Sequence, residues 1–149
     1  MKITYIDSGV LISATDGVGR IAEKALEILG DSQREFACSE LVKLEVSLKA
    51  VFNKQTEEAQ FYEEFFSDVT YWASDLTHIV QEAYQIASQY GLAAMDALHV
   101  AAALSVGAEE LVTTEKRTKP MHRVTSINVV SIFDLITMRN VKNNLETVI

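Results

Sequence analysis

The sequence predicts an α/β fold, a three-layer α/β/α sandwich around a central, mostly parallel sheet. Short apolar runs rich in β-branched residues alternate along the chain with longer stretches of helical periodicity. Strands separated in this way by helices pair in parallel, with helices on both faces of the sheet. One proline and six glycines leave no obvious linker. We therefore expect a single domain over residues 1–149.

Each expected element has a local signal. The strands are KITYI (2–6), EFACS (35–39), DVTYWA (68–73), ELVTT (110–114) and INVVSI (127–132). The helices between them are expected at about 18–30, 40–53, 56–67, 75–90 and 94–106. Gly30 and Gly91 stand where helix C-caps would fall, and Ser39 is a plausible N-cap for the helix that follows it.

Two of these helices carry informative side chains. In the helix over 40–53, one stripe is formed by Leu41, Leu44, Leu48 and Val51, as on a helix that packs one face against a core. Glu45 falls along the edge of that stripe, whereas Glu40 projects near the other edge and is the weaker candidate for a special role. The stretch 56–67 is rich in aromatic residues that suit core packing or a partner surface, namely Phe61, Tyr62, Phe65 and Phe66.

Composition narrows the class of protein. Thirteen Lys and Arg against 21 Asp and Glu give a net charge of −8, which argues against non-specific coating of nucleic acid. An enzyme whose acidic centre holds metal cations remains compatible with this charge. Cys38 is the single cysteine and excludes an internal disulfide, which suits a reducing cytosol. No signal peptide or membrane-spanning run is visible, so we expect a cytoplasmic protein without membrane contact.

Carboxylates gather where the predicted strands end. Asp7 follows the first strand and Glu115 follows LVTT, so both belong at the carboxyl edge of the sheet, where ligands bind in open parallel sheets. Asp96 lies in the first turn of the helix over 94–106, near the same edge, and shares a narrow face with His99 and Ala103. An unpaired buried carboxylate is costly, and a divalent cation would be one compensating partner.

Each of these residues also has an ordinary interpretation. Asp7 suits a helix N-cap, Asp96 suits the helix dipole, and Glu45 suits a solvated helix face. His99 is interpreted as a hydrogen-bonded packing residue rather than a metal ligand. The hypothesis of a cation site therefore rests on the convergence of several carboxylates, not on any single residue. Such oxygen donors favour Mg²⁺ or Mn²⁺. Zinc is not indicated, because no ligand spacing joins Cys38, His78, His99 and His122.

Four segments in this order, YIDSGVLI, SELVKLEV, GLAAMDALHVAAAL and ELVTTEKR, resemble the PIN-domain family, and within it the VapC-type ribonuclease toxins. The resemblance implies an endoribonuclease that depends on Mg²⁺ or Mn²⁺, with metal-binding acids at Asp7, Glu45 and Asp96. Glu115 would be the fourth acid, where the family more usually has Asp. The longer side chain implies shifted or water-mediated ligation. Ser8 and Thr113 match hydroxyl residues that orient the carboxylates by hydrogen bonds.

The same resemblance implies partners. RNA would be the substrate, and the chain would form a homodimer masked by an antitoxin whose peptide lies over the acidic groove. An arginine of that peptide would replace the cation electrostatically. Four cations directly after Glu115 suit either contacts to RNA phosphates or a solvated loop; they are Lys116, Arg117, Lys119 and Arg123.

Two other protein families that place an Asp after the first strand fit this sequence less well than the PIN-domain family. A haloacid-dehalogenase-like phosphatase needs a second Asp two positions after the first, where this chain has Gly9. A receiver domain needs paired acids after its first strand, and DSG does not supply them. The remaining alternative is a PIN-like module that binds RNA or protein without catalysis, with its acids kept for the fold or for holding a partner's arginine.

Overall fold

The computed structural model describes residues 1–136, so residues 137–149 of the predicted domain lie outside the described part. Its centre is a five-stranded sheet in the order β3-β2-β1-β4-β5, with every neighbouring pair parallel. The strands are β1 (Lys2–Ile6), β2 (Arg34–Ser39), β3 (Tyr71–Ala73), β4 (Glu110–Thr113) and β5 (Asn128–Ser131). The predicted α/β fold with a parallel sheet is confirmed.

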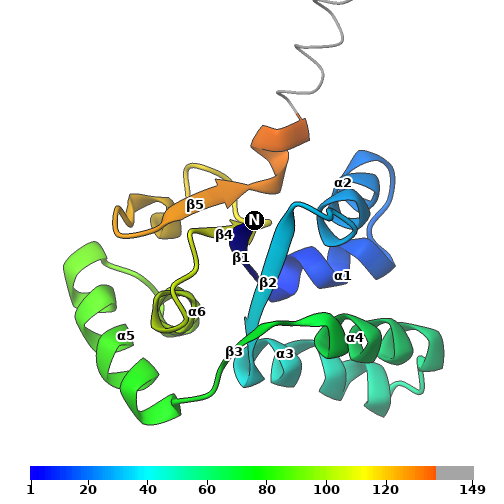
Figure 1. The fold of residues 1–149 in the computed structure, drawn as a ribbon, viewed down its shortest axis with the longest axis horizontal. Helices are drawn as coiled ribbons and strands as arrows, with labels where there is room; N and C mark the ends of the chain where they lie inside the picture. The colour runs from blue at the N-terminus through cyan, green and yellow to red at the C-terminus, as the bar shows by residue number, and fades with distance from the viewer. Residues whose placement is uncertain (137–149) are drawn as a thin grey trace, which may run out of the picture.

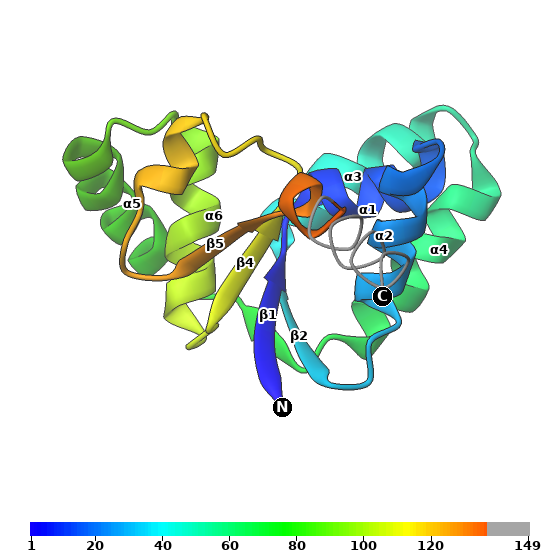
Figure 2. The same ribbon diagram turned by 90° about the horizontal axis from the view of Figure 1, so that it is seen from above.

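Helices cover both faces of the sheet, which gives three layers (Figures 1 and 2). One face carries α1 (Ser8–Asp16), α2 (Arg20–Leu29), α3 (Glu40–Phe52) and α4 (Thr56–Asp68). The other face carries α5 (Leu76–Tyr90) and α6 (Ala94–Ser105), with the short 3₁₀ helix η1 (Pro120–Arg123) beside them. Within the described residues, no helix is long and apolar enough to cross a membrane.

The central strand β1 explains why the predicted strands read as apolar runs. Tyr5 pairs with Ala37 of β2 on one side and with Leu111 of β4 on the other. These three side chains are fully buried, because helices cover both faces of the sheet. Strands enclosed on both faces lose the alternation of apolar and polar residues that a half-exposed strand shows.

The order of the strands reverses beside β1. The chain adds β2 and β3 on one side of β1 and then crosses to add β4 and β5 on the other. In open parallel sheets such a reversal separates the connections at the carboxyl ends of the two neighbouring strands and leaves a crevice there, where ligands bind. Here the two strands are β1 and β4, after which Asp7 and Glu115 follow.

Helix α1 was missing from the sequence prediction, which left residues 7–17 unassigned. Its sequence, SGVLISATD, is short and begins with weak helix formers. Tertiary packing stabilises it instead, since Val10 and Leu11 are fully buried. Gly9 allows a close approach to the end of β4: a Cβ added there would lie 2.1 Å from Thr114 Oγ1.

The predicted core stripe of α3 is wrong. The helix buries Val42, Val46 and Ala50, which are spaced at four residues and form a second apolar stripe. Leu44, Leu48 and Val51 of the predicted stripe are exposed, and Leu41 is only partly buried. Both stripes satisfy helical periodicity, so only the position of α3 against the sheet decides which of them faces the core.

The predicted helix ends are partly confirmed. Gly91 is the C-cap of α5, in a left-handed conformation with φ of 70° that glycine adopts without strain. Gly30 is the C-cap of α2 but has an ordinary φ of −95°. Ser39 stands at the N-cap of α3, yet its side chain does not cap the helix. Its Oγ lies 2.7 Å from the hydroxyl of Tyr5 instead.

Candidate functional site

Asp7 lies between the last residue of β1 and the first of α1, and it is 8% exposed. It occupies the N-cap position of α1, as its ordinary interpretation expects, but its side chain makes no capping hydrogen bond. Two hydroxyls contact its carboxylate instead. Thr113 Oγ1 donates to Oδ2 at 2.8 Å, and Ser8 Oγ lies 3.2 Å from Oδ1. These two hydroxyls hold the Asp7 carboxylate at the carboxyl ends of β1 and β4.

Glu45 reaches the same place from α3. Ser8 Oγ donates to Glu45 Oε1 at 2.9 Å, so one hydroxyl lies between the two carboxylates. His99 Nε2 lies 2.6 Å from the same Oε1. The hydrogen bond from His99 is the largest cause of a lowered pKa of Glu45, opposed by partial burial. Glu45 is therefore held as an anion. The competing Glu40 instead accepts from Trp72 Nε1 at 3.0 Å.

Asp96 stands in the first turn of α6 and is partly buried. The pKa of Asp96 is raised, first by partial burial and then by the charges of Glu115 and Asp7. Glu45 adds to the increase, whereas His99 opposes it. Like charges raise the pKa of a carboxyl only when they lie close to it in a poorly screened setting. A bound cation would relieve this repulsion.

Glu115 lies two residues beyond β4, and its backbone is fixed. Its N–H donates to Thr113 Oγ1 at 3.0 Å, and its carbonyl oxygen lies 2.9 Å from His122 Nε2. Thr113 thus contacts Asp7 with its hydroxyl proton and accepts from the backbone of Glu115. The hydroxyl of Thr113 therefore connects, through two hydrogen bonds, the segments that follow β1 and β4.

The acids do not form a closed cage for an ion. Among residues 1–136, no group of three His, Cys, Asp or Glu side chains converges closely enough to hold a metal. The donor set is nevertheless suitable for Mg²⁺, which keeps several waters and is commonly bound through one or two carboxylates. The residues present therefore fit a hydrated hard cation, not a zinc site with four protein ligands.

His99 is the residue that the sequence interpretation undervalued. It is 2% exposed, as expected for a packing residue, but it contacts the candidate site directly through Glu45. Its Nε2 also lies 4.0 Å from Asp7 Oδ1. Burial lowers the pKa of His99, but the hydrogen bond to Glu45 and the charges of Asp7, Glu45 and Asp96 outweigh it, so its pKa is raised. The signal in the sequence was its position one turn after Asp96.

The basic segment after Glu115 is only partly free to bind a ligand. Arg117 Nε lies 3.5 Å from Asp134 Oδ2, although the arginine side chain is 81% exposed. Arg123 donates to the carbonyl of Tyr90 at 3.1 Å. Lys116 lies over the ring of Phe133 at 5.9 Å, and Lys119 is exposed. Lys116 and Lys119 are thus the better placed of the four cations for a phosphate contact.

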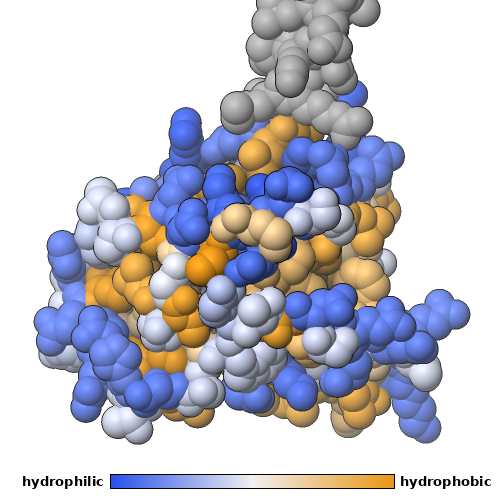
Figure 3. Space-filling model, viewed as in Figure 1, coloured by the Kyte–Doolittle hydropathy of each residue, from blue (hydrophilic) through white to orange (hydrophobic). Residues whose placement is uncertain are grey.

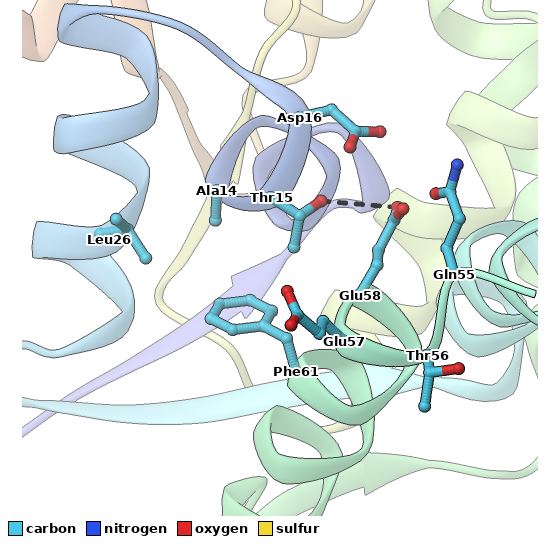
Figure 4. Close-up of a pocket in the computed structure, with 9 residues that line it drawn as sticks. All are labelled: Ala14, Thr15, Asp16, Leu26, Gln55, Thr56, Glu57, Glu58 and Phe61. Carbon is cyan, nitrogen blue, oxygen red and sulfur yellow. Dashed lines mark hydrogen bonds between the residues drawn. The ribbon is translucent and has the colours of Figure 1, made fainter.

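A separate pocket of about 600 Å³ lies between α1, α2 and the start of α4 (Figure 4). Three acids line it, Asp16, Glu57 and Glu58, beside the apolar side chains of Leu26 and Phe61. None of the four predicted metal-binding acids lines this pocket. It has room for a basic side chain flanked by an apolar one.

An apolar groove of about 280 Å³ lies on the opposite side of the sheet, between α5 and α6. Hydrophobic residues come to the surface there (Figure 3). Val80 and Tyr84 of α5 are exposed along it. The predicted aromatic contact surface over 56–67 is mostly core, since Tyr62, Phe65 and Phe66 are buried. Phe61 of that stretch lines the acidic pocket of Figure 4.

Solved structures share this fold. One is a toxin–antitoxin complex from Klebsiella pneumoniae, with 22% identity and a TM-score of 0.67 over 87% of this chain and 97% of that chain. Another is VapBC2 from Rickettsia felis bound to a promoter DNA fragment, with 21% identity and a TM-score of 0.64 over 87% and 98%. FitAcB from Neisseria gonorrhoeae matches with 14% identity and a TM-score of 0.61 over 87% and 98%. At these identities the likeness is one of fold.

Comparison of the sequence with protein families identifies the family of the chain, which the structural likeness alone does not. No curated protein matches the chain significantly. Residues 4–125, however, match the PIN domain, a stretch that begins within β1 and ends just after η1. This match spans most of the sequence and includes Asp7, Glu45, Asp96 and Glu115. The chain therefore belongs to the PIN domain family.

Proposed function

We propose that this protein is a metal-dependent endoribonuclease of the VapC toxin type, which hydrolyses phosphodiester bonds in RNA. The observation that carries the proposal is the position of Ser8 Oγ, which lies 3.2 Å from Asp7 Oδ1 and 2.9 Å from Glu45 Oε1, so that the carboxylate after β1 and one of α3 meet at one hydroxyl. Carboxyl groups that repel one another at the carboxyl edge of the sheet, where β1 and β4 end, are suited to a cation. Membership of the PIN domain family supports the same reaction class.

In this proposal, Asp7, Glu45 and Asp96 hold Mg²⁺ or Mn²⁺, and Glu115 completes or tunes the site. Water completes the coordination, because no three of these side chains converge among the described residues. Ser8 and Thr113 orient Asp7 through their hydroxyl groups. When bound, the cation supplies Lewis acidity that activates a water and offsets charge on the cleaved phosphate.

The chain's own residues bind and orient the RNA. Lys116 and Lys119 are exposed in the segment directly after Glu115, so their ammonium groups are the proposed contacts to RNA phosphates. Because the chain carries a net charge of −8, these local cations counteract repulsion between the acidic protein and RNA. Unpaired RNA is the expected substrate, since proteins that recognise RNA often bind single-stranded loops.

The direct test is cleavage of single-stranded RNA in Mg²⁺ or Mn²⁺, comparing the wild type with Asp96→Asn. The matched control is Asp68→Asn, which changes an exposed carboxylate at the end of α4. Cleavage that requires the metal, is lost in Asp96→Asn and persists in Asp68→Asn supports the proposal. Cleavage that is independent of metal, or unchanged in Asp96→Asn, indicates a contaminating nuclease and contradicts it.

The second candidate is a PIN-like module that binds RNA or protein without cleaving it. The lack of a three-ligand cluster in the described part of the chain favours this alternative, as does Glu in place of Asp at position 115. Such a module would bind RNA or a partner with the same affinity in EDTA and in Mn²⁺. A nuclease would show saturable binding of Mn²⁺ in the absence of RNA.

An antitoxin is the proposed protein partner, because structures of similar fold are toxin–antitoxin complexes. The acidic pocket of Figure 4 suits a basic side chain of such a partner, with Leu26 and Phe61 packing against its apolar neighbour. A second arginine of the partner would reach Asp7 and Asp96 in place of the cation. This arrangement would mask the acids until the partner is removed.

We also propose a cytoplasmic homodimer. Four large apolar side chains of α3 are more than half exposed, namely Leu44, Leu48, Val51 and Phe52. Exposed apolar stripes of this kind usually mark an interface. A second copy of the chain is the occupant that we propose for this stripe, since α3 also carries Glu45 and dimerisation would stiffen the helix that presents it.

A further inference from the structure

His99 spans two parts of the molecule with its two ring nitrogens. Nε2 lies 2.6 Å from Glu45 Oε1 on α3, and Nδ1 lies 2.9 Å from the hydroxyl of Tyr5 on β1. The ring is 2% exposed and packs against the ring of Tyr5, with centroids 6.0 Å apart. A histidine that only filled space in the core would need no such pair of polar partners on separate elements.

The hydrogen-bond chain behind His99 is also buried. Tyr5 OH lies 2.7 Å from Ser39 Oγ, and both residues are fully buried. A carboxylate only accepts hydrogen bonds, so His99 Nε2 carries a proton and donates it to Glu45. If Nδ1 is unprotonated it accepts from Tyr5, and if it is protonated it donates to Tyr5. The direction of the bond to Glu45 is the same in both cases.

Glu45 needs this support because its side chain is more exposed than that of Asp7. Its side chain is 35% exposed, against 12% for Asp7. Its two donors among the described residues, Ser8 and His99, both bond to Oε1. Oε2 is thus the oxygen left for a cation or a coordinated water. Fixing one oxygen of a flexible glutamate sets the direction of the other.

We propose that His99 is a positioning residue, which holds Glu45 Oε1 so that the carboxylate faces the cation site beside Asp7, and that Tyr5 and Ser39 hold His99 in turn. This inference rests on the proposed function. It assigns His99 no contact with RNA or with the cation. Partners that orient metal-binding carboxylates in this way commonly change metal affinity when they are removed.

The experiment measures binding of Mn²⁺ alone, by titration calorimetry on RNA-free protein, in the wild type and in two variants. His99→Leu removes the donor but keeps an apolar side chain, and we expect its affinity for Mn²⁺ to fall about 10-fold or more. His99→Gln keeps an N–H donor near the place of Nε2, and we expect it to restore affinity to within about 3-fold of the wild type. Circular dichroism verifies that each variant is folded.

A matched control removes a hydrogen bond to another glutamate of α3. Trp72→Phe deletes the N–H that donates to Glu40 at 3.0 Å, and it should leave Mn²⁺ affinity unchanged. If His99→Leu does not fold, Tyr5→Phe takes its place, since it removes only the hydroxyl behind His99, and we expect an affinity loss of about 3-fold. A folded His99→Leu or Tyr5→Phe that binds Mn²⁺ like the wild type would overturn the inference. A wild type that binds no Mn²⁺ would instead overturn the proposed function.

Discussion

Thr113 and Asp7 are 106 residues apart in the sequence, yet Thr113 Oγ1 donates to Asp7 Oδ2 at 2.8 Å. The bond joins the carboxyl ends of β4 and β1, the two strands between which the order of the sheet reverses. It orients one oxygen of Asp7 and leaves the other to Ser8. A buried threonine thus connects the topology of the sheet to the orientation of a candidate metal ligand.

Thr113→Val tests this connection, because valine has nearly the same shape but no hydroxyl. We expect Mn²⁺ affinity to fall about 10-fold, since Asp7 loses its orienting donor. The free energy of unfolding should fall by about 1–3 kcal/mol, because the N–H of Glu115 also loses its acceptor. Calorimetry and urea denaturation measure the two quantities.

The control for that variant lies at the other end of the sheet. Thr4 donates to the buried Glu110 at 2.7 Å, a bond of similar type far from the candidate site. Thr4→Val should lower stability and leave Mn²⁺ affinity unchanged. Equal effects of the two substitutions on Mn²⁺ affinity would contradict a specific role for Thr113.

Asp96→Asn is expected to stabilise the metal-free protein. Burial and the charges of Glu115 and Asp7 raise the pKa of Asp96, so its anionic form is disfavoured in the folded state. At neutral pH this repulsion destabilises the native protein, and a neutral amide removes it. The urea midpoint measured in EDTA should rise, while binding of Mn²⁺ is lost. No rise relative to Asp68→Asn would show that the acids do not repel one another.

The stability of the metal-free protein should depend on pH through His99. The pKa of His99 is raised above its usual 6.5, because the hydrogen bond to Glu45 and nearby carboxylates outweigh the effect of burial. The folded state therefore binds the proton more tightly than the unfolded state. The stabilisation from protonated His99 is complete below the pKa that His99 has in the unfolded state. It is lost as pH rises through the higher pKa that His99 has in the folded state.

Urea midpoints in EDTA, between about pH 6 and about pH 9, measure this dependence. The wild type should lose stability as pH rises across that window, and His99→Gln should lose less, since glutamine does not titrate. Glu45 does not interfere, because its pKa is lowered from 4.5 and it titrates at more acidic pH. Parallel curves for the two proteins would refute the prediction.

The homodimer prediction is tested at the exposed stripe of α3. Leu48 is 62% exposed, and Leu48→Glu places a charge in the centre of the proposed interface. Light scattering should give a dimer mass for the wild type and a monomer mass for the variant. Val18→Glu changes an apolar residue that is 83% exposed between α1 and α2, and it should leave the dimer intact.

Two other results of that measurement would be decisive. A wild type that is monomeric at all concentrations would show that the homodimer prediction is wrong. Dissociation by Val80→Glu, but not by Leu48→Glu, would place the interface at the groove between α5 and α6 instead.

RNA contacts are tested in the Asp96→Asn background, in EDTA, so that the RNA is not cleaved. Lys119→Ala should weaken binding of single-stranded RNA and reduce the slope of log affinity against log salt by about 0.7, as expected for one phosphate contact. Lys49→Ala, which removes an exposed lysine of α3, serves as the control. A salt slope unchanged by Lys119→Ala would indicate that this segment is a solvated loop.

Much of the fold was predictable because its signals are local. Every strand was expected within about three residues of its observed bounds, and α3 to α6 were expected within two. The short η1 and α1 were not expected; α1 lacks strong helix formers and is stabilised by the burial of Val10 and Leu11. No local pattern encodes that burial, so the helix was not predicted.

The sequence by itself determined that Asp7 and Glu115 follow parallel strands and that Asp96 begins a returning helix. Alternation of strands and helices requires a parallel sheet, and parallel strands place their carboxyl ends at one edge. Only the tertiary structure decided which stripe of α3 faces the core and what His99 contacts. Helical periodicity permits two apolar stripes on α3, and the hydrogen bond between His99 and Tyr5 joins residues 94 positions apart. Such choices depend on how distant elements pack, which no single stretch of sequence contains.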